Sequence, residues 1–155
     1  MKRIIECVPN FSEGRHAKNI EKIVEPFRGQ KGVKLLDYQT DEDHNRMVVT
    51  VVGEPKGLKA AVIEAVGCAI DVIDMRTHQG QHPRMGATDV VPFIPIKNVS
   101  VEEAVAGGLP AHFRRWGRRF VKTAAVSVAS VGVPTIVASH LLGRQSPSNT
   151  LRMAS

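Results

Sequence analysis

The chain has 155 residues and a formal net charge of +6, a size typical of one domain with its own core. Residues 1–104 hold all 15 acids and 14 of the 21 Lys and Arg residues, a net charge of 14 − 15 = −1, so the excess charge lies in residues 105–155. A nucleic-acid partner inferred from overall charge would rest on that last third alone, and we do not expect one.

The N-terminus becomes acidic at Glu6 before any long apolar run develops, which argues against a secretory signal. Cys7 and Cys68 have no metal-like spacing. We therefore expect a cytoplasmic protein in which both cysteines are reduced.

The elements follow from hydrophobic periodicity. In chain order, the pattern predicts a strand at 3–8, a helix at 15–27, strands at 33–38 and 46–52, a helix at 55–74 and a strand at 89–96. Pro55 suits the first position of the second helix. Pro92 and Pro95 each remove a backbone donor, which predicts an edge position or an irregular course for the last strand.

This order of elements is the split βαβ arrangement of the ferredoxin-like fold, βαββαβ. We therefore expect an α+β protein with a four-stranded, mostly antiparallel sheet and both helices on one face. The strands are apolar on both sides, so a partner domain or a second chain should cover the other face.

The pattern changes after residue 105. Ser100 and Glu103 form a capping-box signature for a third helix, but Gly107–Pro110 would end that helix after barely two turns. We divide the chain into a folded unit, 1–105, and a divergent basic tail, 106–155.

Four interpretations of the tail stay open. It could be a flexible extension, or the product of a truncated or frame-shifted gene, which resequencing the coding DNA would test. The run Thr123–Leu142 has the length of a membrane span but contains Gly132, Pro134 and several hydroxyl side chains. The Arg pairs around Trp116 could contact nucleic acid.

The segment from His78 to Asp89 is polar and rich in glycine, and it carries the residues best suited to chemistry. His82 is a candidate general acid or base, and the Arg84 fork suits a carboxylate. The alternatives are a solvated histidine and a surface ion pair of Arg84 with Asp89. His78 and His82 are four residues apart, but Gly80 makes a helical zinc pair improbable, so we expect no metal.

A second candidate segment follows the first strand. Asn10, Ser12 and Gly14 could cradle a ligand where the first helix begins, or they could simply cap that helix. The acidic run Asp41–Asn45 is typical of a solvated turn.

Three groups of segments resemble the N-terminal subdomain of glutamate formimidoyltransferase, a formiminotransferase. They are Glu6–Gly14; then Leu35–Asp37, Asp43–Arg46 and Val51–Pro55; and Ile73–Pro95, which contains His82-Pro83-Arg84-Met85-Gly86-Ala87-Thr88-Asp89. The resemblance runs from about Ile4 to Val105.

The resemblance implies transfer of a formimino group from N-formimino-L-glutamate to N5 of tetrahydrofolate, in histidine degradation. Tetrahydrofolate would be a co-substrate, with no metal. The family fold is similar to two ferredoxin-like subdomains that face each other across the ligand, in a homodimer. The catalytic histidine of the family matches His82. The residues expected to bind substrate or folate are Asn10, Asp37, Asn45, Arg46, His78 and Arg84.

The chain departs from the family in two places. Gln39 stands where the family often has a second acid, for which Asp41 or Asp43 could substitute. The second subdomain is not recognisable after Val105, so we expect the isolated chain to be weakly active or inactive. The alternative is a non-catalytic ferredoxin-like module for binding or dimerisation.

Overall fold

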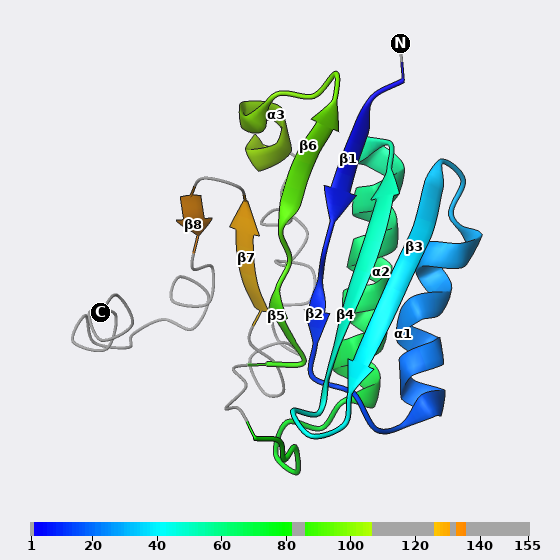
Figure 1. The fold of residues 1–155 in the computed structure, drawn as a ribbon, viewed down its shortest axis with the longest axis vertical. Coiled ribbons are helices and arrows are strands. Elements are labelled where there is room, and N and C mark those ends of the chain that lie inside the picture. Colours follow the sequence, from blue (N-terminus) through cyan, green and yellow to red (C-terminus); the bar gives the residue numbers. More distant parts are fainter. Residues whose placement is uncertain (1, 82–85, 107–125, 131–132, 136–155) are drawn as a thin grey trace, which may run out of the picture.

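The computed structural model describes residues 2–81, 86–106, 126–130 and 133–135. Its elements, labelled in Figure 1, are β1 (Ile4–Cys7), β2 (Asn10–Phe11), α1 (Ala17–Gly29), β3 (Val33–Asp41), β4 (Arg46–Gly53), α2 (Pro55–Val72), β5 (Thr88–Val90), β6 (Phe93–Lys97), α3 (Val101–Ala106), β7 (Val126–Ser130) and β8 (Val133–Thr135).

The first and last predicted strands are each interrupted where a proline occurs. β1 and β2 flank Val8 and Pro9, and β5 and β6 flank Val91 and Pro92. The two interruptions lie against each other, because the Val8 N–H donates to the Pro92 carbonyl at 3.3 Å. The predicted irregular course of the last strand is therefore confirmed. The alternative prediction, a position at the edge of the sheet, is wrong. β5 pairs with both β2 and β7, and β6 pairs with both β1 and β7.

The sheet runs from β3 through β4 to β1 and β2, then to β5 and β6, and on to β7 and β8. Its pairings are antiparallel except for those of β7 with β5 and β6. The α+β class is confirmed, and the arrangement is consistent with a ferredoxin-like fold in general. The described residues form eight strands rather than four, because two predicted strands are split and β7 and β8 are added.

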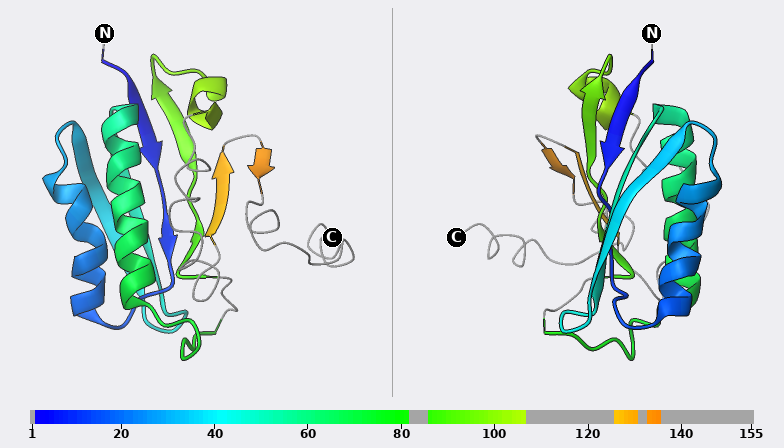
Figure 2. Two further views of the ribbon diagram at one scale, coloured as in Figure 1. Left: turned by 180° about the vertical axis from the view of Figure 1, so that it is seen from behind. Right: turned by 45° about the vertical axis from the view of Figure 1, so that its right-hand side comes forward.

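Helices α1 and α2 lie side by side on one face of the sheet (Figure 2). The helices cover this face because it is the apolar one. In strand β4, alternate residues from Met47 to Gly53 point to this face and are buried, as the two-residue period of a strand requires. In α1, Ile20, Ile23, Val24 and Phe27 supply the matching buried face. The core between the layers also takes Phe11 and Leu58, both fully buried.

The opposite side of the sheet, here called the open face, looks toward the reader in Figure 1. Val48, Thr50 and Val52 alternate with the buried residues of β4 and are only partly buried. Glu6 pairs with Val52 and Ile94, which places these three side chains on the open face. The described part of the chain therefore leaves this face partly exposed, and its covering by a partner stays a prediction.

The start of α3 has the predicted capping box. The Glu103 N–H donates to Ser100 Oγ at 3.1 Å, and the Ser100 N–H donates to Glu103 Oε2 at 3.0 Å. The Arg pairs, Trp116 and most of the run Thr123–Leu142 lie outside the described residues. The division of the chain at residue 105 therefore stays a prediction.

Cys7 is buried and Cys68 is partly buried, and neither forms a disulfide. Burial raises the pKa of both thiols. Within the described ranges, no helix is both long and apolar enough to cross a bilayer.

Candidate functional site

Three loops meet at one end of the sheet, at the bottom of Figure 1. They are the β2–α1 loop (residues 12–16), the β3–β4 turn (residues 42–45) and the α2–β5 loop, of which residues 73–81 and 86–87 are described. Direct bonds join the first two loops, since Arg15 Nε donates to the Glu42 carbonyl at 2.7 Å. The loops carry most of the polar residues that the sequence singled out.

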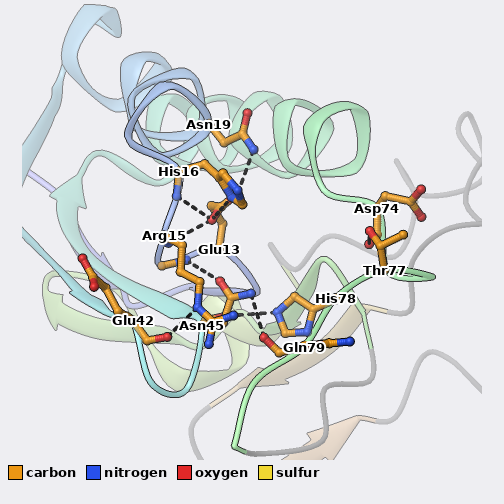
Figure 3. A network of polar contacts seen from close by, with 11 residues as sticks. Glu13, Arg15, His16, Asn19, Glu42, Asn45, Asp74, Thr77, His78 and Gln79 are labelled. Atoms are coloured by element: carbon orange, nitrogen blue, oxygen red, sulfur yellow. Dashed lines mark hydrogen bonds and ion pairs between the residues drawn. The ribbon is translucent and has the colours of Figure 1, made fainter.

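Asn45 lies where the three loops meet (Figure 3). Its side chain accepts a hydrogen bond from the Gly14 N–H at Oδ1 (3.0 Å) and donates one from Nδ2 to the Gln79 carbonyl (3.0 Å). The residue is 7% exposed and has a φ of 49°, a left-handed conformation that asparagine tolerates better than most residues. Asn45 thus ties the β2–α1 loop to the α2–β5 loop.

His78 is held by the backbone of the same residue. Its Nε2 is 3.1 Å from the Asn45 carbonyl oxygen, and the ring is partly buried. A carbonyl oxygen can only accept, so Nε2 carries the hydrogen. In the neutral ring, Nδ1 is then the acceptor nitrogen.

The segment around Gly80 packs directly on the β3–β4 turn. A Cβ at residue 80 would stand 2.4 Å from the His44 carbonyl oxygen, which is far too close. The Gln81 N–H donates to the Asp43 carbonyl at 3.2 Å. The chain leading toward His82 is therefore fixed against the turn by backbone contacts that only a glycine at residue 80 permits.

Glu13 is a functional candidate to which the sequence analysis assigned no role. Its side chain is 5% exposed and accepts hydrogen bonds from the Arg15 and His16 N–H groups, both at 3.0 Å, and from Asn19 Nδ2 at 2.7 Å. Burial acts to raise its pKa, but these bonds outweigh burial, and the pKa falls below its usual value. Polar residues at positions 13, 16 and 19, at three-residue steps, were the signal available in the sequence.

Two further histidines of this region are bonded to carboxylates. His16 Nδ1 is 3.1 Å from Glu13 Oε1, and His44 Nδ1 is 2.7 Å from Asp41 Oδ2. The backbone N–H and the ring of His44 lower the pKa of Asp41. In both pairs the carboxylate favours a proton on Nδ1, which leaves Nε2 as the acceptor of the neutral ring.

The proposed cradle of Asn10, Ser12 and Gly14 does not form as an open cup. Ser12 is 1% exposed, and its Oγ donates to the Gly86 carbonyl at 2.6 Å. Gly14 lies against the β3–β4 hairpin, since a Cβ there would stand 2.4 Å from the Asp41 carbonyl oxygen. The helix-cap interpretation is wrong, because the N-cap of α1 is His16 and has no side-chain cap hydrogen bond. Glu13 accepts from the Arg15 and His16 N–H groups just before the helix.

Three other predicted residues lie on the open face, in β2, β3 and β4. Asn10 pairs with Val48, Asp37 pairs with Thr50, and Arg46 begins β4. Asn10 Nδ2 is 3.5 Å from the Val8 carbonyl oxygen, Asp37 accepts from Gln39 Nε2 at 3.1 Å, and Arg46 is 3.7 Å from Asp41. Arg84 and His82 lie outside the described residues, so their positions stay predictions.

No three His, Cys, Asp or Glu side chains of the described segments are grouped as a metal ion would need. A groove of about 670 Å³ lies between α1 and α2, lined in part by Lys22, Glu64 and Cys68. Since none of the predicted site residues lines it, we place the candidate site at the three loops.

Comparison with known proteins identifies the family. Residues 4–136 match the model of the formiminotransferase domain, N-terminal subdomain. The chain belongs to this family. The predicted resemblance is thereby confirmed, and the proteins it is similar to are named as enzymes.

Among the relatives, the glutamate formimidoyltransferase of Streptococcus pyogenes serotype M1 is 48% identical over 105 residues, covering 68% of this chain and 35% of that protein. That of Thermoplasma acidophilum is 40% identical over 102 residues, covering 66% of this chain and 34% of the relative. The formimidoyltransferase-cyclodeaminase of Sus scrofa is 38% identical over 146 residues, 94% of this chain and 25% of that protein. The chain thus spans about a third or less of these relatives.

Proposed function

We propose that this chain is the part of a formiminotransferase that supplies proton transfer. The reaction would move a formimino group from N-formimino-L-glutamate to N5 of tetrahydrofolate, as a step in histidine degradation. Membership of the formiminotransferase family carries this proposal, and the polar loop cluster beside the open face supports it. The fold we propose for the unit is ferredoxin-like.

His82 is the proposed general acid and base. When a folate amine attacks the formimino carbon, the attacking nitrogen must lose a proton and the departing glutamate nitrogen must gain one. One imidazole near neutral pH can do both in turn. Asn10, Asp37, Arg46 and Arg84 are proposed to bind the carboxylate and polar groups of the two substrates.

The proposed partner is a second subdomain that covers the open face, within a homodimer. Because holding both reactants in place supplies much of the rate, the isolated chain should be weakly active or inactive. The site we propose needs no metal ion.

The test is an assay of formimino transfer from formiminoglutamate to tetrahydrofolate. It uses this chain alone and this chain mixed with the C-terminal part of the Streptococcus relative. We expect activity in the mixture, and its loss on His82→Ala but not on the matched change His140→Ala, at a histidine without a proposed role. Transfer that survives His82→Ala would remove His82 from the mechanism. Folate binding with no transfer in any mixture would favour the non-catalytic binding module.

A further inference from the structure

The side chain of Asn45 is occupied by the protein's own backbone. Oδ1 accepts from Gly14 and Nδ2 donates to Gln79, both at 3.0 Å, and only 7% of the residue is exposed. An amide used in this way presents little surface to a ligand. Direct substrate binding by Asn45, expected from the family resemblance, therefore fits the geometry poorly.

The main chain of Asn45 acts on His78. Its carbonyl accepts from His78 Nε2 at 3.1 Å, while its side chain holds the carbonyl of the next residue, Gln79. One residue therefore fixes two consecutive positions of the α2–β5 loop. The close packing of Gly80 on His44 and the bond from Gln81 to Asp43 keep the same two segments in register.

We propose that Asn45 is a positioning residue that holds neutral His78 in the tautomer with its hydrogen on Nε2. The remaining nitrogen, Nδ1, then accepts a hydrogen bond, so the ligand group that His78 takes is an N–H donor. This assignment rests on the proposed function, because amino and imino groups are the N–H donors of that reaction. It gives His78 a role in orienting the reacting nitrogen, distinct from proton transfer by His82.

The test measures the tautomer directly. The ¹⁵N NMR signals of the His78 ring are recorded in alkaline buffer for the whole chain and for Asn45→Gly. Glycine accepts the left-handed conformation, so this change keeps the backbone carbonyl that faces His78 and removes the side chain with its two bonds. Without the bond to Gln79, residues 78 and 79 are no longer held against that carbonyl. Asn98→Gly is the matched control: Asn98 also has a positive φ, 54°, and its side chain makes one bond, to the Lys2 carbonyl.

We expect wild-type His78 to carry its hydrogen on Nε2. Asn45→Gly should let the loop move away from the residue 45 carbonyl and weaken the bond from His78 Nε2. The tautomer ratio should then shift about fivefold toward Nδ1, the factor that corresponds to loss of that one net hydrogen bond. Asn98→Gly should leave the ratio unchanged. Asn45→Asp keeps the acceptor for Gly14 but sets a carboxylate against the Gln79 carbonyl. Asn45→Asp should also shift the tautomer ratio toward Nδ1. If Asn45→Gly does not fold, the result for Asn45→Asp decides whether Asn45 positions His78.

A wild-type ring protonated on Nδ1 would overturn the proposal, as would a ratio that stays within about twofold of wild type in the folded Asn45 variants, a shift smaller than one hydrogen bond. These signals need no turnover. Absence of formimino transfer in the mixture with the C-terminal part of the Streptococcus relative would therefore count against the proposed function, while the tautomer result would still decide the role of Asn45.

Discussion

Gly80→Ala tests the packing between the α2–β5 loop and the β3–β4 turn. The added Cβ would stand 2.4 Å from the His44 carbonyl oxygen, 3.0 Å from the carbonyl carbon and 3.3 Å from Asn45 Cβ. Gly80 does not have a positive φ, so the expected effect is steric rather than conformational. Two of the three opposing atoms belong to the backbone and cannot move aside as a flexible side chain would.

The size of the effect follows from these contacts. The two segments would have to separate by about 1 Å to reach ordinary van der Waals distance. That shift would stretch the bonds from Gln81 to Asp43 (3.2 Å) and from Asn45 to Gln79 (3.0 Å) beyond useful range. Each is worth about 1 kcal/mol net. With the strain of overpacking added, the free energy of unfolding should fall by about 2–3 kcal/mol.

Urea unfolding of wild type and variant measures this difference. Gly29→Ala is the matched control, because a Cβ at the last residue of α1 meets no atom within 4 Å. That change should be neutral or stabilise the protein by up to about 1 kcal/mol. The reasoning is refuted if Gly80→Ala stays within about 0.5 kcal/mol of wild type, the range of an ordinary surface substitution.

Two further predictions concern buried groups. Glu13→Gln should lower the free energy of unfolding by about 2 kcal/mol at neutral pH, because a charged acceptor of several hydrogen bonds is lost. The folded-state pKa of Glu13 is lowered from its unperturbed value of 4.5. The stability that Glu13 contributes is therefore present above pH 4.5 and is lost as pH falls through the folded-state value. Urea unfolding from pH 7 downward should therefore show the two proteins converging as the pH falls below 4.5, and a constant gap would contradict this. The second prediction concerns the two cysteines: a thiol reagent should label partly exposed Cys68 well before fully buried Cys7. Mass spectrometry of the native protein measures the two labelling rates. Equal rates would contradict the burial of Cys7.

Much of the layer structure was predictable because it depends on local periodicity. A single buried face is marked by the alternation along Met47–Gly53 and by the spacing of Ile20, Val24 and Phe27. The bounds of α1 and α2 each lie within two residues of the predicted ones. The capping box of α3 could also be recognised, because both partners lie within four residues of sequence.

The loop cluster was predictable only as a set of polar residues. The sequence indicated that His78 and Asn45 belong to a site, but it assigned both to ligand binding. Their mutual contact joins positions 33 apart, and the bond from Gly14 to Asn45 spans 31. No local pattern encodes such distances, since they depend on how three loops meet after the sheet has formed.

The sequence by itself determined the order of the helices and strands up to β6, the buried faces and the family, since each depends on residue type and short spacing. Only the tertiary structure decided that Glu13 is a buried carboxylate with backbone donors around it, and that the Asn45 amide is occupied by Gly14 and Gln79. The physical reason is that a polar side chain acts through the partners it meets. Those partners come from distant segments, which the packing of α1 and α2 on the sheet brings into contact.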